Sequence, residues 1–167
     1  LDRLKARALD TGNEWFSPSN LEVTDLSVGN PATNVIPAEA KARLNIRFND
    51  LHSGAALVEW VRSVADEVAP KAVIVAKISG EAFLTPPDGF SSMITDAIRA
   101  GTGIEPKLST KGGTSDARFI VKDCPVVEFG LVGQTMHQTD ERVAVDDLAK
   151  LAAIYRKVLN AYFAPEA

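Results

Sequence analysis

Apolar and polar residues alternate along residues 40–48, which is typical of a β-strand with one buried face. Residues 21–28 alternate less strictly and predict a second strand. Between them, residues 29–37 hold two prolines and two asparagines and read as a loop. The apolar face of the clearer strand consists of Ala42, Leu44, Ile46 and Phe48.

Apolar residues spaced three and four apart predict helices in five places. Residues 1–9 read as the last turns of an amphipathic helix. Ser53 is a predicted N-cap for a helix that runs to Pro70. The remaining helices are predicted over residues 90–98, ending at Gly101 and Gly103, over residues 115–121, and as a long final helix from a cap at Asp146 that includes Tyr162.

Three further short strands are predicted, over residues 73–78, 107–109 and 126–131. In the first half, the order helix, strand, strand, helix, strand is similar to a ferredoxin-like unit without its first strand. The second half reads as part of an α/β layer fold. Because Pro86 and Pro87 mark a linker, we expect an α/β (α+β) protein with two domains, residues 1–83 and 84–167.

The composition is that of an ordinary globular protein, with 46% apolar and 24% charged residues and a net charge of −4. We therefore expect no nucleic-acid surface, and no apolar run is long enough for a membrane span. Cys124 is the single cysteine, so no internal disulfide forms and a cytoplasmic location is expected. We expect its side chain to be buried. Because no methionine opens the sequence, we also expect it to be part of a longer protein.

The run Ser-Thr-Lys-Gly-Gly-Thr-Ser-Asp, residues 109–116, is the most informative local pattern. It reads as a strand end, a tight glycine turn and a helix start. Glycines allow close approach of a ligand, and the free N–H groups of a helix start favour an anion. The run therefore predicts a seat for a carboxylate or a phosphate. The alternative is an ordinary turn with a capping Thr114, Ser115 or Asp116.

Three other residues could carry chemistry. His137 follows the apolar strand 126–131 and could bind a metal, move a proton or contact a substrate, or be a loop histidine without a role. Arg47 could bind a carboxylate through its planar fork or simply be a surface cation, and Asn34 lies between the two clear strands. Zinc sites need three or more ligands, so any companions of His137 would lie outside this chain. We expect His52 to be exposed.

Five segments, in order and over nearly the whole chain, resemble the M20 family of di-zinc amidohydrolases and peptidases. They read Ala-Thr-Asn-Val-Ile-Pro, Leu-Asn-Ile-Arg-Phe, Ser-Gly-Glu-Ala-Phe-Leu-Thr, the glycine turn with its following helix, and His-Gln-Thr-Asp-Glu-Arg-Val. The segments begin at residues 32, 44, 79, 109 and 137. The first and fourth are similar to the branch of the family that hydrolyses N-succinyl-LL-2,6-diaminopimelate.

This resemblance implies an enzyme of lysine and diaminopimelate biosynthesis that releases succinate and LL-2,6-diaminopimelate. Two zinc ions, or cobalt as a substitute, would activate water, and a glutamate would act as general base. It implies His137 as one metal ligand. From the residues themselves, we expect the exposed edge or face of the one-sided sheet in the first, lid domain to form a homodimer contact. Contacts to the dicarboxylate substrate would come from Asn34, Arg47, Ser79, Gly113, Thr114 and Ser115.

The family's N-terminal catalytic half has no counterpart here, including the remaining zinc ligands and the general base. The resemblance therefore implies a lid domain followed by the C-terminal part of a catalytic domain, with no catalytic residue of its own, no stably bound zinc and no activity alone. Asp140 is a smaller departure, because the family more often has Asn there. Two alternatives stay open: another M20 member, such as an acetylornithine deacetylase or an aminoacylase, and a non-catalytic dimerisation module.

Overall fold

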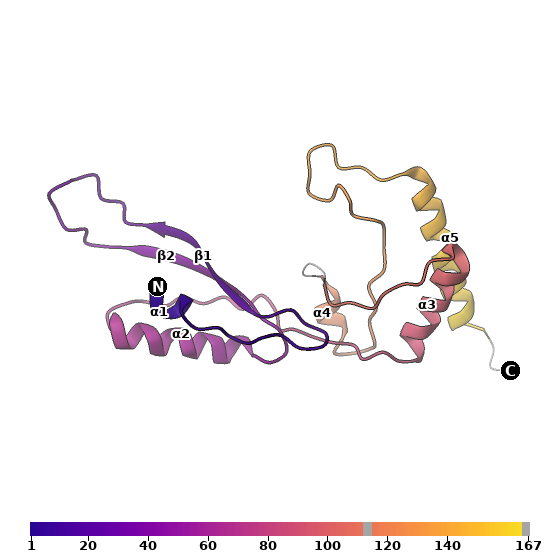
Figure 1. Cartoon of the computed structure of the whole chain (residues 1–167), viewed down its shortest axis with the longest axis horizontal. Coiled ribbons are helices and arrows are strands. Elements are labelled where there is room, and N and C mark those ends of the chain that lie inside the picture. The colour runs from indigo at the N-terminus through magenta and orange to yellow at the C-terminus, as the bar shows by residue number, and fades with distance from the viewer. Residues whose placement is uncertain (112–114, 165–167) are drawn as a thin grey trace. The chain divides into compact units, whose positions relative to one another are not determined.

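The computed structural model describes residues 1–111 and 115–164. They form two compact units (Figure 1). The first unit holds Leu1–Leu84 with Thr110 and Lys111, and the second holds Thr85–Ser109 with the described residues from Ser115 on. The elements are α1 (Asp2–Lys5), β1 (Asn20–Ser27), β2 (Lys41–Arg47), α2 (Gly54–Val68), α3 (Gly89–Thr102), α4 (Ala117–Ile120) and α5 (Val145–Tyr162).

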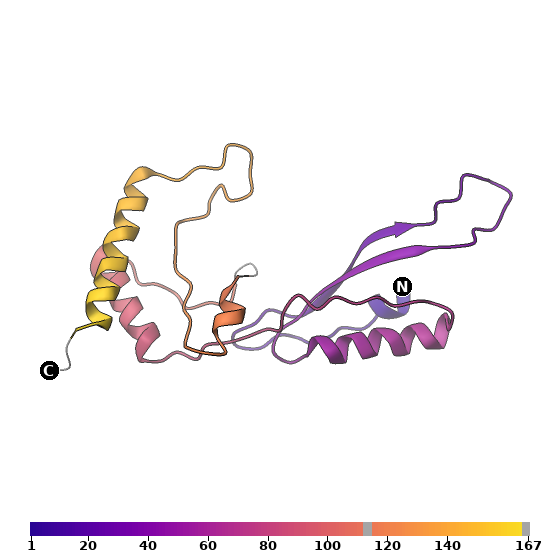
Figure 2. The same cartoon turned by 180° about the vertical axis from the view of Figure 1, so that it is seen from behind.

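In the first unit, β1 and β2 form the predicted antiparallel pair, with Leu21 opposite Ile46. The register shifts between Val23 and Asp25, and the hydroxyl of the extra residue, Thr24, donates to the Arg43 carbonyl oxygen at 3.3 Å. Figures 1 and 2 show the two strands as a long twisted hairpin. The mixture of helices with a small antiparallel sheet confirms the broad fold class.

Helix α2 begins as its sequence predicts. The Ser53 hydroxyl accepts a hydrogen bond from the Ala56 N–H at 3.2 Å, so Ser53 is the N-cap. The helix ends at Val68, two residues before Pro70, which would remove a helical hydrogen bond. Short helix α1 contacts both α2 and β1, and the buried apolar residues of this unit are Leu4, Leu57 and Val61.

The second unit is built on α3 and α5, which pack side by side (Figure 2). Asp88 caps α3 in a reciprocal capping box with Ser91, and Gly103 ends it in the left-handed region at φ 72°. Gly101 allows the close packing, because a Cβ there would lie 2.9 Å from Cγ1 of Ile154. The buried core consists of Ile94, Ala97, Ile98 and Ile154, with Val127 and Phe129 packed against it.

The three additional strands are not formed. Residues 73–78, 107–109 and 126–131 have no strand partner in the part of the chain that the structure describes. Strand-like sequence alone does not make a strand, because its backbone groups need a neighbouring ladder. Val73 and Val75 accordingly stay 86% and 91% exposed.

Three local expectations also need correction. The first helix covers only Asp2–Lys5, and Asp146 lies in the first turn of α5, where Ala144 is the N-cap. Asp146 still favours this helix start through its charge. Cys124 is exposed rather than buried, as are its neighbours Asp123 and Pro125. None of the helices within the described ranges combines the length and the apolar character that a bilayer crossing requires.

Candidate functional site

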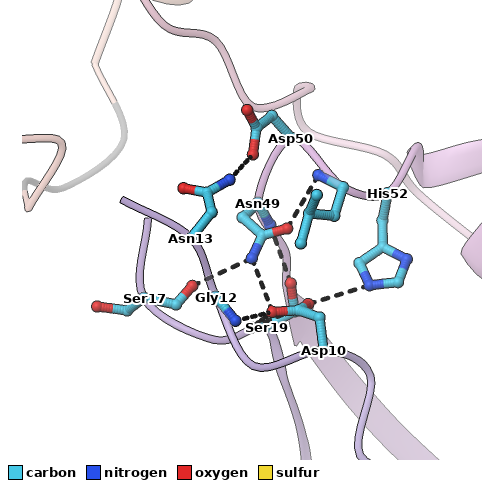
Figure 3. A network of polar contacts seen from close by, with 9 residues as sticks. Asp10, Gly12, Asn13, Ser17, Ser19, Asn49, Asp50 and His52 are labelled. Atoms are coloured by element: carbon cyan, nitrogen blue, oxygen red, sulfur yellow. Dashed lines mark hydrogen bonds and ion pairs between the residues drawn. The ribbon is translucent and has the colours of Figure 1, made fainter. Parts of the chain in front are cut away.

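The best-defined polar cluster of the first unit surrounds the Asp10 carboxylate (Figure 3). It accepts hydrogen bonds from the backbone N–H groups of Gly12, at 2.7 Å, and Ser19, at 3.2 Å. Nδ2 of Asn49 donates to it at 2.8 Å, and Nε2 of His52 lies 3.0 Å from its second oxygen. Asp10 thus joins the loop before β1 to the connection between β2 and α2.

Asn49 is the second centre of this network and is only 3% exposed. Its backbone N–H donates to the Ser19 hydroxyl at 3.0 Å, and its Nδ2 also donates to the Ser17 carbonyl at 3.2 Å. Its side-chain oxygen accepts from the Leu51 N–H at 3.0 Å. Since its amide is satisfied at both ends, Asn49 fixes the path of the chain directly after β2.

The environment of Asp10 holds its carboxyl group in the charged form. Burial by itself would raise the pKa, but hydrogen bonds from Ser19, Gly12 and Asn49 outweigh it and hold the pKa of Asp10 well below its ordinary value. Because its oxygens are taken up by these donors, Asp10 is suited to organising the loop rather than to exchanging protons with a substrate.

This network was missed by reasoning from the sequence, and the expectation of an exposed His52 was wrong. The side chain of His52 is only 16% exposed, against Asp10. A local signal existed at Asp10, because an aspartate two residues before a glycine often accepts that residue's N–H. Pairing with Asn49 and His52, 39 and 42 residues away, has no such local signal.

Three of the predicted substrate residues lie in the first unit and all are exposed. Asn34 lies in a turn of the β1–β2 hairpin loop, Arg47 is the last residue of β2, opposite Asn20, and Ser79 lies in the extended segment after α2. Their side chains are therefore accessible to a ligand. Arg47 stands two residues before Asn49, so the Asp10 network fixes the chain beside it.

At the glycine turn, Gly113 and Thr114 lie outside the described residues. Before the turn, the Thr110 hydroxyl donates to the Trp15 carbonyl oxygen, within the first unit. After it, Ser115 belongs to the second unit, and its hydroxyl accepts from the Ala117 N–H at 3.2 Å. Ser115 thus makes a local side-chain bond beside the start of α4, whose N-cap residue, Asp116, makes no side-chain cap hydrogen bond.

His137 lies in an exposed loop of the second unit. Its backbone has φ 62°, and its N–H donates to Oε2 of Glu141 at 3.3 Å. The loop is closed at its base by Thr135, whose hydroxyl bonds both the N–H and the carbonyl of Arg142. Across the described ranges, no group of three or more His, Cys, Asp or Glu side chains could hold a metal ion.

Comparison with known proteins identifies the class. The model of peptidase family M20/M25/M40 matches residues 12–161, and the chain belongs to this family.

Named relatives point further. Succinyl-diaminopimelate desuccinylase of Rhizorhabdus wittichii is 60% identical over 164 residues, which cover 98% of this chain and 44% of that protein. The enzymes of the same name from Novosphingobium aromaticivorans and Roseobacter denitrificans are 61% and 54% identical, over 93% and 98% of this chain and 41% and 44% of their own lengths. The chain thus spans less than half the length of these relatives.

Proposed function

We propose that this chain is the lid and the C-terminal catalytic part of a succinyl-diaminopimelate desuccinylase. The observation that carries the proposal is identity of 53–61% to several relatives of that name along nearly the whole chain. The reaction would be hydrolysis of the amide of N-succinyl-LL-2,6-diaminopimelate to succinate and LL-2,6-diaminopimelate, a step of lysine biosynthesis in the cytoplasm.

In this proposal the chain supplies residues that bind the carboxylates of the substrate. Arg47 would bind one carboxylate through paired charge-assisted hydrogen bonds, and Asn34 and Ser79 would orient it. The exposure of all three side chains supports this role. Gly113, Thr114 and Ser115 would hold a further carboxylate at the glycine turn.

A divalent metal fits the family, and zinc is the ion we propose. His137 would contribute one imidazole ligand, and its exposed loop supports that assignment. When bound, two zinc ions would polarise the amide carbonyl and lower the pKa of water. Because the described residues supply no complete ligand set, the other ligands and the general-base glutamate would belong to the rest of the parent enzyme.

The two structural units support a further part of the proposal, a lid domain over residues 1–83 and a catalytic part over residues 84–167. The β1–β2 hairpin with α1 and α2 is the framework on which we base a ferredoxin-like lid that also forms the homodimer contact. Sedimentation of the complete protein would test the dimer. A monomer at micromolar concentration would contradict it.

The decisive test is an assay of the complete natural protein that contains this sequence. We expect it to release succinate from N-succinyl-LL-2,6-diaminopimelate, to lose activity with a chelator and to recover it with zinc. N-acetylornithine is the matched comparison substrate, and preference for it would favour a deacetylase instead. Residues 1–167 alone should be inactive. Substrate turnover by them would refute the proposal that the other metal ligands and the general base belong to the rest of the parent enzyme.

A further inference from the structure

Glu81 closes the start of helix α2 from a distant position in the chain. Its two carboxylate oxygens lie 3.0 and 3.2 Å from the backbone nitrogen of Gly54, and both accept from that N–H. Gly54 is the first residue of α2 and is 27 residues away in sequence. The contact lies wholly within the first unit.

Electrostatics favour this contact. The first turn of α2 carries no acidic side chain, and Ser53 satisfies the N–H of Ala56. The positive end of the helix dipole therefore has no negative partner within the helix itself. Glu81 supplies both the missing charge and an acceptor for one of the free N–H groups.

The packing around Gly54 leaves little room for a side chain at this position. A Cβ on Gly54 would lie 2.8 Å from Cγ2 of Ile78 and 3.0 Å from Oε1 of Glu81. Ile78 and Glu81 flank Ser79 and Gly80 in sequence. The segment that carries Ser79 thus contacts the start of α2 at two points, through the apolar side chain of Ile78 and the charged carboxylate of Glu81.

The connection from β2 to α2 is held from two sides. At its beginning, Asn49 is bonded to Asp10 and Ser19, two residues after Arg47. At its end, Gly54 is bonded to Glu81, two residues after Ser79. The short path from residue 47 to residue 54 therefore links the two segments that carry Arg47 and Ser79.

We propose that Glu81 is a positioning residue, which sets the Ser79 segment against the start of α2 and so fixes the spacing of Ser79 and Arg47 for a dicarboxylate substrate. The proposal rests on the substrate-binding roles given above to Ser79 and Arg47. Glu81 itself contacts the helix, not the substrate.

The first test reads the contact itself, by ¹⁵N NMR of residues 1–167 without any ligand. We expect the amide proton of Gly54 to resonate downfield, to shift upfield in Glu81→Ala and to be intermediate in Glu81→Gln, which keeps one acceptor but loses the charge. Glu59→Gln is the matched control, because Glu59 pairs with Arg62 on the same helix at 3.0 Å. A Gly54 amide that is unchanged in Glu81→Ala would overturn the contact.

The second test reads the positioning role, in the complete protein. For N-succinyl-LL-2,6-diaminopimelate we expect Glu81→Ala to raise KM about tenfold with kcat changed less than about threefold, as for loss of uniform substrate binding. Glu81→Gln should restore part of the lost affinity, and Glu59→Gln should behave as the unsubstituted protein. An unchanged KM in Glu81→Ala, with the Gly54 shift lost, would overturn positioning while leaving the contact in place.

The two proposals fail in different ways. If the unsubstituted complete protein does not release succinate, the proposed function fails, and the positioning role fails with it. If that protein is active and Glu81→Ala lowers kcat and stability without raising KM, only the positioning role fails.

Discussion

Nδ2 of Asn49 donates to Oδ1 of Asp10 at 2.8 Å, and this bond joins segments 39 residues apart. The loop before β1 and the chain after β2 are held together mainly by polar groups around it, in a unit whose buried apolar residues are few. Since buried polar groups stabilise a fold only when they are satisfied, this network is where substitutions should be felt most.

Asn49→Ala should destabilise the first unit by about 2–3 kcal/mol, because it removes a donor from Asp10, whose side chain is only 7% exposed, and from the Ser17 carbonyl. Chemical denaturation followed by far-UV circular dichroism measures the change. Asn13→Ala is the matched control: Asn13 donates to Asp50 and accepts from the N–H groups of Trp15 and Phe16, all in exposed bonds, so its loss should cost less. Equal losses in the two variants would contradict the central role of Asn49.

The pKa of Asp10 makes a prediction about acid stability. Because its pKa is lowered on folding, its contribution is fully present above the ordinary aspartate pKa of about 4 and is lost as the pH falls towards the pKa in the folded state. The free energy of unfolding should therefore drop between about pH 5 and pH 2 more steeply in the unsubstituted chain than in Asp10→Asn. If the unfolding free energies of the two proteins changed in parallel with pH, Asp10 would have the same pKa in the folded and unfolded states, contrary to the prediction.

Much of the fold could be predicted because it depends on neighbours in sequence. The alternation of apolar and polar residues predicted strands β1 and β2. Ser53 predicted the start of α2, and Gly103 predicted the end of α3. Residues 73–78 show the limit of such reasoning. Their sequence favours a strand, yet a strand forms only where a neighbouring strand pairs with it through backbone hydrogen bonds. The local sequence does not show whether such a neighbour exists.

The candidate site shows the same division. The proposed substrate roles of Arg47 and Ser79 come from resemblance to a family, whereas Glu81 and Asn49 act through bonds to groups 27 to 39 residues away. Such bonds depend on how the units fold. A motif can therefore indicate the residues that contact a substrate, but it does not indicate the polar groups that hold those residues in place.

Gly54 is the first residue of α2 and Gly89 is the first residue of α3. We expect replacement by alanine to have opposite effects on stability at the two positions. Gly54→Ala should destabilise by about 1–2 kcal/mol, because its Cβ would meet Ile78 and the Glu81 carboxylate. At Gly89, no atom of the described residues lies within 4 Å of an added Cβ, so Gly89→Ala should be neutral or stabilise by about 0.5–1 kcal/mol. Thermal unfolding compares them, and stabilisation by Gly54→Ala would contradict the close packing.

The proposed metal role of His137 is best tested with a substitution that its backbone tolerates. With φ 62°, a change to Ala would add backbone strain to the loss of the imidazole, whereas Asn adopts this region readily. In the complete protein, His137→Asn should lower kcat by at least about 100-fold and reduce the bound zinc measured by elemental analysis, with little change in unfolding temperature.

Asp140→Asn is the control for that experiment, because Asp140 has φ 60° in the same loop and is not assigned to the metal. Asn suits this conformation at least as well as Asp, so we expect unchanged zinc content and an equal or slightly higher unfolding temperature. If His137→Asn kept both its zinc and its activity, His137 would not be a ligand. Loss of zinc in Asp140→Asn as well would instead trace the effect to the shape of the loop, which Thr135 and Arg142 close at its base.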